Sequence, residues 1–277
     1  MADRGRGAGD PRPTKAQRKD DARRQREEIQ RRMAQRKKSR AIAAGGSVVV
    51  AGAVVVAFIL ASGGGLPKPA DLLAQAGDAQ KSASCDAVQT VAPFDPANVT
   101  GDVQAAEAGD PANVDRNHIG DTLDPTPPKL SKYPTVPPTS GPHAPIPPGP
   151  LPPGVYDQAP DIYRAIHSLE HGATIIWYSP SASGEQLQLL KDFYNQRLVE
   201  EAVGQDRVLV APYDYPDQGA AGQLADGVQM ALVSWHRLET CGQVNLAAAF
   251  AFTSQYSAPP FESRQYLGEA PEAGASL

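Results

Sequence analysis

The chain has 277 residues, of which 26 are Lys or Arg and 31 are Asp or Glu, so its formal net charge is −5. The charge is unevenly distributed, because residues 1–40 contain 15 basic and 6 acidic side chains and the rest of the chain contains 11 and 25. The basic region has no aromatic residue to stack against bases and no folded domain around it, which excludes nucleic-acid binding as a function.

An uncharged apolar segment follows the basic region. No Asp, Glu, Lys or Arg occurs between residues 41 and 67, and residues 41–62 are long enough for a helix that crosses a bilayer. The positive-inside rule then places residues 1–40 in the cytoplasm as a basic tail. We therefore expect a single-pass signal anchor in the cell membrane, with the C-terminal part extracytoplasmic. The alternative is cleavage as a signal peptide at Ala61-Ser62-Gly63, but the basic region is long for that class.

The exported part begins with a small and polar stretch. We expect residues 63–84 to be a linker with a short helix at 71–75, and the following chain to wrap the surface as far as residue 117. Cys85 and Cys241 both lie on the exported side, where disulfides persist, and we predict that they form a structural disulfide. A redox or metal-binding pair is the alternative, but the C-x-x-C spacing typical of one is absent.

A long proline-rich loop region precedes the core. Residues 125–160 contain 14 prolines, and each proline fixes φ and removes an amide donor. A long helix or a central strand is therefore excluded here, which leaves turns and extended polyproline II segments. A stiff loop region of this kind also suits a contact surface for a protein or another partner in the cell envelope.

Apolar periodicity after the loop region predicts a small sheet with two helices. Runs of β-branched and aromatic residues favour strands, and apolar residues spaced three and four apart favour helices. In chain order the expected elements are a strand at 173–178, a helix at 183–198, strands at 207–213 and 228–238, and a helix at 245–256. This order predicts an α+β domain over residues 85–262, with both helices on one face of the sheet. Residues 263–277 are expected to be a disordered tail.

Four of the five histidines fall within 54 residues and occur in or near two unusual strings, P-P-T-S-G-P-H at 137–143 and H-S-L-E-H-G at 167–172. Two of them are spaced i, i+4, which places both rings on one face of a helix. Histidine is the commonest metal ligand in proteins, so the pattern predicts a transition-metal site. The expected ligands are His143, His167 and His171, with His118 joining them from upstream.

Glu170 lies inside the second string and can act as a ligand, as a group that orients a histidine, or as a general base. Three histidines with an open position describe a catalytic zinc site and four describe a closed one, and copper is also compatible with imidazole ligands. The H-x-x-E-H pattern from His167 to His171 occurs in zinc peptidases, so a metal-dependent hydrolase is an alternative. The nominal downstream ligands for it are Glu200, Glu201 and Glu239.

The same residues also admit a purely architectural interpretation. The histidines can satisfy backbone groups in a region that is short of amide donors, with residues 139–142 forming a turn. Ser140 is a candidate nucleophile, but the G-x-S-x-G pattern is absent and a turn fits it better. His236 follows the alternation of the third expected strand, and we expect it at the edge of the core.

The two strings carry a resemblance to a known family. They resemble an uncharacterised, mainly actinobacterial family of single-pass membrane proteins, domain of unknown function 3105, over roughly residues 85–256. The other residues that carry the resemblance are Cys85, His118, Tyr133, Gly154, Tyr156, Trp235 and Arg237. It implies a membrane anchor and an exported domain, but no activity. Extracytoplasmic metal binding is therefore the leading hypothesis, and a non-enzymatic envelope interaction module and a hydrolase are the alternatives.

Overall fold

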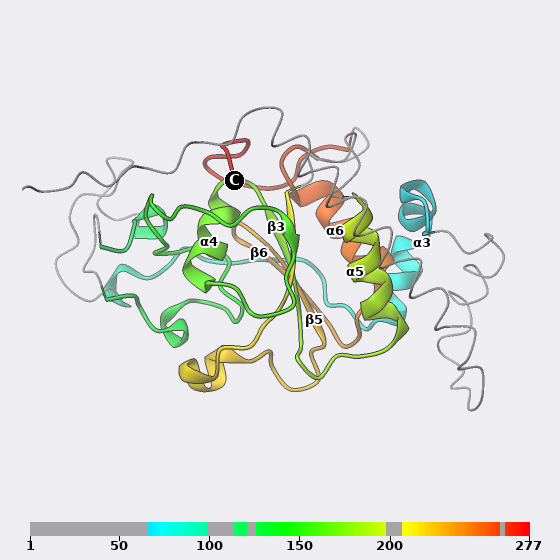
Figure 1. Ribbon diagram of the computed structural model, residues 1–277, viewed down its shortest axis with the longest axis horizontal. Helices are drawn as coiled ribbons and strands as arrows, with labels where there is room; N and C mark the ends of the chain where they lie inside the picture. The colour runs from blue at the N-terminus through cyan, green and yellow to red at the C-terminus, as the bar shows by residue number, and fades with distance from the viewer. Residues whose placement is uncertain (1–65, 99–113, 121–125, 198–206, 261–263) are drawn as a thin grey trace, which may run out of the picture. The chain divides into compact units, whose positions relative to one another are not determined.

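The computed structural model describes residues 66–98, 114–120, 126–197, 207–260 and 264–277 (Figure 1). The expected cytoplasmic tail at 1–40 and the expected signal anchor at 41–62 lie outside these residues. Within the described ranges, no helix has both the length and the apolar character that crossing a membrane requires.

A mixed six-stranded sheet forms the centre of the domain, with the strand order β1-β6-β5-β3-β4-β2. The strands are β1 (Gln89–Thr90), β2 (Gly154–Val155), β3 (Thr174–Tyr178), β4 (Val208–Pro212), β5 (Met230–Ser234) and β6 (Arg237–Cys241). β4 is parallel to both β3 and β2, whereas β5 is antiparallel to β3 and β6. The α-helices are α3 (Pro69–Ser82), α4 (Ile162–Glu170), α5 (Glu185–Arg197) and α6 (Leu246–Tyr256). The predicted α+β class is confirmed.

Helices cover both faces of this sheet. Successive residues of a strand point to opposite faces, and Ile175 of β3 accordingly packs in one apolar cluster with α4, while Ile176 packs in a second cluster with α3, α5 and α6. Figure 1 shows α4 on one side of the strands and α5 and α6 on the other. The prediction of helices on one face only is therefore wrong, because it did not count α4 as a covering element.

The ends of two helices are fixed by side chains that the sequence supplies at the right positions. Asp161 precedes α4 and accepts hydrogen bonds from the amides of Tyr163 and Arg164. Asn245 precedes α6 and accepts from Ala247 and Ala248 in the same way. Each cap satisfies amides that have no partner within the helix, which typically stabilises a helix by about 1 kcal/mol.

The third expected strand, 228–238, is two strands joined by a tight turn. β5 ends at Ser234 and β6 begins at Arg237, and His236 between them has φ of +56°. The apolar alternation continues up to the turn, and the turn contains neither Gly nor Asn, so the sequence pattern does not predict a hairpin. His236 consequently lies in the turn, where its Nε2 is 2.6 Å from Oδ2 of Asp115.

Both ends of the described domain are more ordered than predicted. The expected linker at 63–84 contains α3, whose Leu72 is buried and which packs against α6. The expected disordered tail at 263–277 contacts the domain through Arg207, whose guanidinium donates to the carbonyls of Gly274 and Ala275. These segments consist largely of small and polar residues, and the contacts that order them involve residues far away in the sequence.

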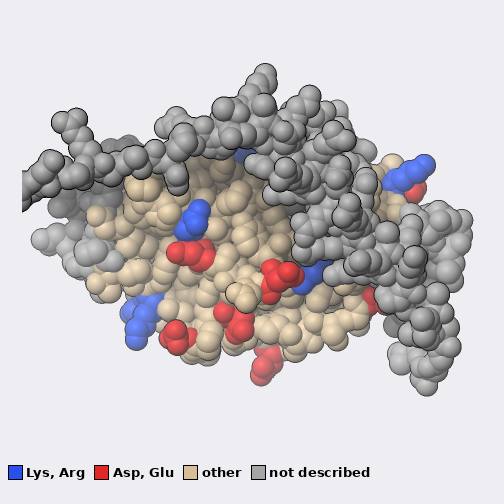
Figure 2. Space-filling model, viewed as in Figure 1, with Lys and Arg blue, Asp and Glu red and all other residues tan. Residues whose placement is uncertain are grey.

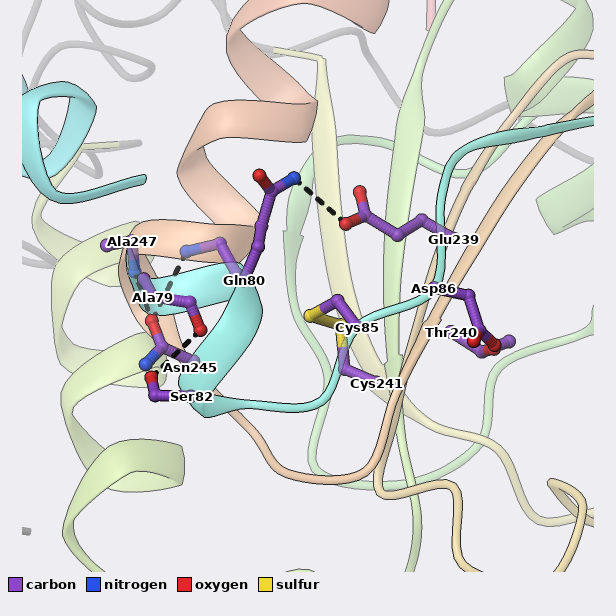
Figure 3. The surroundings of a disulfide bond; sticks show 11 residues. Ala79, Gln80, Ser82, Cys85, Asp86, Glu239, Thr240, Cys241, Asn245 and Ala247 are labelled. Carbon is purple, nitrogen blue, oxygen red and sulfur yellow. Dashed lines mark hydrogen bonds between the residues drawn. A yellow bond between two sulfur atoms is a disulfide. The ribbon is translucent and has the colours of Figure 1, made fainter. Parts of the chain in front are cut away.

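A disulfide joins the chain after α3 to the end of β6. The sulfur atoms of Cys85 and Cys241 are 2.09 Å apart, and the two residues face each other across an isolated antiparallel bridge (Figure 3). The bridge ties the first helix of the domain to the central sheet across 156 positions of sequence.

Candidate metal centre

Three segments bring the histidines together. The chain around His118 runs parallel to the loop around His143, because the amide of Ile119 donates to His143 O at 2.8 Å and the amide of His143 donates to Asn117 O at 3.1 Å. The amide of Ala144 then donates to Tyr163 O in α4, which also carries His167. The imidazole centroid of His118 is 4.9 Å from that of His143 and 5.1 Å from that of His167.

The end of α4 positions the second half of the cluster. α4 ends at Glu170, His171 is its C-cap, and Gly172 follows with φ of +87°, a left-handed conformation that glycine adopts without steric cost. The amide of Gly172 donates to Leu169 O at 3.0 Å and closes the helix end. A Cβ at this glycine would lie 2.6 Å from Ala258 Cβ, so the sharp turn also requires glycine for space.

Three of these four neighbouring histidines use Nδ1 for the same kind of contact. Nδ1 of His143 lies 2.9 Å from Gly141 O, that of His167 lies 2.7 Å from Ala144 O, and that of His171 lies 2.6 Å from Ser276 O. A carbonyl oxygen only accepts, so each Nδ1 carries the proton, and Nε2 of the neutral ring carries a lone pair. Metal-binding histidines are held in this way, with one ring nitrogen donating to a carbonyl and the other facing the ion.

The Nε2 atoms of these rings converge. Nε2 of His167 and Nε2 of His171 are only 3.1 Å apart, and Nε2 of His143 is 3.1 Å from Oε2 of Glu170. One ligand atom from each of His118, His143, His167 and Glu170 lies within 4.8 Å of the others. We call these four residues the histidine cluster. A second group with the same spacing consists of Glu170, His171 and Glu272.

One arginine aligns the two carboxylates of these groups. Arg116 Nε donates to Oε1 of Glu170 at 3.0 Å, and its terminal nitrogen donates to Oε1 of Glu272 at 2.7 Å. The other oxygen of each carboxylate faces a histidine, since Oε2 of Glu272 is 3.3 Å from Nε2 of His171. Arg116 therefore turns one oxygen of each carboxylate towards the imidazoles.

The surroundings of His167 and Glu170 determine their protonation states. The side chain of Glu170 is 2 % exposed and His167 is 1 % exposed. Burial, with further contributions from His143 and His171, lowers the pKa of His167 to about 3. Burial raises the pKa of Glu170, but hydrogen bonds and charge interactions with His143 and Arg116 outweigh it and bring this pKa to about 2. At neutral pH the site therefore offers a neutral imidazole and an ionised carboxylate, the forms that bind metal ions.

The sequence prediction named most of this site and arranged it differently. All four predicted histidines and Glu170 lie together, but His118 belongs to the histidine cluster, whereas His171 groups with Glu272 at its edge. Sequence reasoning missed Arg116 and Glu272. The only sequence signal for Arg116 is its place two residues before a histidine, and Glu272 lies in a segment whose composition predicts disorder.

Other candidates of the sequence do not join the site. Among the described residues, the buried hydroxyl of Ser140 has no hydrogen-bond partner, so no base activates it as a nucleophile. Glu239 lies beside the disulfide, and His236 pairs with Asp115. The remaining nominal ligands, Glu200 and Glu201, lie outside the described residues.

The family model described as "Protein of unknown function (DUF3105)" matches residues 128–266, slightly more than half of the chain. The chain therefore belongs to this family, as the two histidine strings indicated. The match contains His143, His167 and Glu170, while Cys85 and His118 precede it. Comparisons with curated proteins and with solved structures found no match.

Proposed function

We propose that this chain is a membrane-anchored, extracytoplasmic protein that binds one transition-metal ion through the histidine cluster. The observation that carries the proposal is the arrangement of the Nε2 atoms. Nδ1 of His143 and of His167 is committed to a backbone carbonyl, and both Nε2 lone pairs face the same small space as a buried carboxylate.

This arrangement is electrostatically unfavourable without a cation. When both rings are neutral, Nε2 of His167 and Nε2 of His171 both carry lone pairs at a separation of 3.1 Å, a distance at which two acceptors repel each other. Oε2 of Glu170 is 3.1 Å from a third Nε2, that of His143, and accepts a hydrogen bond from it when that nitrogen is protonated. A bound cation that takes the lone pair of His167 removes this repulsion.

The donor atoms favour zinc or copper(II). The histidine cluster offers three imidazole nitrogens and one carboxylate oxygen, a set that suits borderline divalent ions in four-coordinate geometry. Magnesium and calcium prefer oxygen ligands, and copper(I) prefers sulfur. Both cysteines are joined to each other in the disulfide and therefore supply no thiolate.

The geometry favours binding over hydrolysis. A hydrolase would need Glu170 to take a proton from water, but one of its oxygens accepts from Arg116 and the other faces His143. The helix that carries the H-x-x-E-H pattern also ends at Glu170, whereas zinc peptidases carry such a pattern within a longer helix. Glu170 is therefore better suited to be a ligand.

An interaction module remains the second candidate, and one observation favours it. Ile146, in the proline-rich loop region, is 67 % exposed, so its side chain is accessible to a partner. If the loop region binds an envelope partner, Ile146→Ser should abolish capture of that partner while metal content stays the same. On the face shown in Figure 2, acidic and basic side chains of the described residues are interspersed.

The proposed location rests on two features. Residues 41–62 are uncharged and of spanning length, behind a strongly basic segment. The disulfide between Cys85 and Cys241 supports an oxidising compartment for the domain, because the cytosol keeps thiols reduced. Cysteine labelling from outside intact cells, at a site engineered into the exposed end of α5, would test the orientation: failure to label without permeabilisation would contradict it.

Metal titration of the purified full chain tests the proposed function. After treatment with a chelator, the chain should bind one equivalent of zinc from zinc sulfate, or of copper from copper sulfate, measured by calorimetry. At a free-ion concentration 100 times Kd, binding should stabilise the fold by about 2.7 kcal/mol. The double variant His143→Gln/His167→Gln should lose binding. The control variant, His236→Gln, removes a histidine outside the cluster and should bind as the parent does. Equal binding by the double variant, or none by the parent, would contradict the proposal.

A further inference from the structure

A buried carboxyl group lies beside the disulfide. Glu239 precedes Cys241 by two positions in β6, so both side chains point to the same face of the sheet. One carboxylate oxygen of Glu239 and the sulfur atoms of Cys85 and Cys241 all lie within 4.8 Å of one another. Figure 3 shows the carboxyl group facing the amide of Gln80 of α3, near the disulfide. This group of residues is separate from the histidine cluster.

Only one of the two oxygens of this carboxyl group accepts a hydrogen bond from the residues that the structure describes. Gln80 Nε2 donates to Oε1 of Glu239 at 2.9 Å, while Oε2 has no hydrogen-bond partner among the residues that the structure describes. Glu239 is 1 % exposed. A buried polar atom without a partner is costly and demands an explanation beyond packing. One of the two carboxylate oxygens also lies within 4.8 Å of both sulfur atoms.

The surroundings keep this carboxyl group partly protonated near neutral pH. Burial raises the pKa of Glu239 to about 7, against the hydrogen bond from Gln80 and with a further contribution from the charge of Asp86. Tyr256 of α6 also lies close enough to sense the charge of Glu239, and burial keeps its own pKa above the usual value. A carboxylic acid of this kind can give a proton to a neighbouring atom at the pH of the cell envelope.

We propose that the Cys85–Cys241 disulfide exchanges with a dithiol reductant, and that Glu239 donates a proton to the sulfur that leaves. Cys85 is the partly exposed partner, whereas Cys241 is 1 % exposed, so the reductant reaches Cys85. A thiolate released at Cys241 would be a charge without solvent around it. The carboxyl group of Glu239 is placed to neutralise this charge as it forms.

The exchange balances in two steps. A thiolate of the dithiol attacks Cys85 Sγ and forms a mixed disulfide, while the electron pair of the broken S–S bond passes to Cys241 Sγ, which takes the proton of Glu239. The second thiolate of the dithiol then attacks the first sulfur of the same dithiol, which is bonded to Cys85 Sγ in the mixed disulfide. This step releases Cys85 as a thiolate, which takes a proton from water. The protein disulfide is reduced to two thiols and the dithiol is oxidised to a disulfide. Solvent returns the proton to Glu239.

The rate of reduction of the full chain by dithiothreitol, measured by acid quenching and thiol counting from pH 5.5 to 8.5, tests this inference. The rate constant per dithiothreitol thiolate should be highest below pH 6 and fall about tenfold by pH 8.5, as Glu239 loses its proton. In Glu239→Gln it should be low and independent of pH. The matched control Glu185→Gln, an exposed residue at the start of α5, should follow the parent.

Two results would overturn the inference. One is a parent rate constant per thiolate that does not change with pH, and the other is a Glu239→Gln profile that matches the parent. Circular dichroism of each oxidised variant establishes that it is folded before reduction. If Glu239→Gln fails to fold, the pH profile of the parent decides, because the bend near pH 7 is expected from Glu239 alone.

Discussion

Replacing Glu239 by Gln should change how the stability of the domain depends on pH. Glutamine has nearly the same shape as a protonated glutamic acid and can still accept the hydrogen bond from Gln80. It cannot ionise, so it removes the energetic cost of a buried charge. The variant therefore separates the effect of ionisation from the effect of packing at this position.

The pKa of Glu239 gives the size and sign of the effect. Its pKa is about 7 in the folded chain and 4.5 ordinarily, so between these values the unfolded chain ionises while the folded chain holds the proton. The folded state binds more protons there, and the free energy of unfolding must fall as pH rises from 4.5 to 7. A difference of 2.5 in pKa corresponds to about 3 kcal/mol. Glu239→Gln should match the parent at pH 4 and be about 3 kcal/mol more stable at pH 8.

Urea unfolding of the oxidised full chain at several pH values, followed by tryptophan fluorescence, measures this difference. Trp177 and Trp235 are both buried and report loss of the core. Glu185→Gln is the matched control and should stay parallel to the parent at every pH. A constant difference between Glu239→Gln and the parent from pH 4 to pH 8 would show that Glu239 ionises normally, and the reasoning would be refuted.

Three further predictions concern single contacts. Gly172→Ala should lower the free energy of unfolding by about 2–4 kcal/mol, because the new Cβ clashes with its neighbours in addition to straining the left-handed backbone. Gly227→Ala, at a residue with φ of +82° and open space around it, should lower it by about 1 kcal/mol. Equal losses for the two variants in urea unfolding would contradict the clash at Gly172. Arg116→Met should lower the free energy of unfolding by about 3 kcal/mol, because it leaves the buried charge of Glu170 without the guanidinium that pairs with it. Arg116→Lys should restore part of this loss. An unchanged melting temperature in Arg116→Met would contradict the pairing. Reducing the disulfide should cost roughly 5 kcal/mol in the chain-entropy model for its long loop, and an unchanged urea midpoint after reduction would contradict a stabilising bridge.

The parts of the fold that the sequence predicted are those with strong local periodicity. β3 is a run of β-branched and aromatic residues, and α5 and α6 have apolar residues at helical spacing, so local pattern and tertiary burial agree. The β5–β6 hairpin was missed because Trp235 and His236 form its turn, and neither residue is typical of one. α3 was underestimated because its burial depends on contacts with α6, which lies more than 160 residues away in sequence.

The candidate site shows the same division. The two histidine strings identified three rings and Glu170, since residue types with metal-binding chemistry at short spacing are visible in a sequence, and His118 lies 25 residues before His143. The contribution of Glu272 and of the Ser276 carbonyl was not predictable, because the C-terminal segment contacts residues far away in the sequence, among them Arg116, His171 and Arg207. The order of the rings around the site, with His118 inside and His171 at the edge, also depends on pairing between distant segments.

X-ray absorption at the zinc edge of the zinc-loaded full chain tests the central claim most directly. The account predicts three imidazole nitrogens and one carboxylate oxygen at about 2.0–2.1 Å, with the multiple-scattering pattern of histidine and no sulfur in the first shell. The His143→Gln/His167→Gln variant should lose this signature while its circular dichroism stays the same. A first shell of oxygen atoms only, or a spectrum unchanged in the double variant, would mean that the histidine cluster is not the metal site.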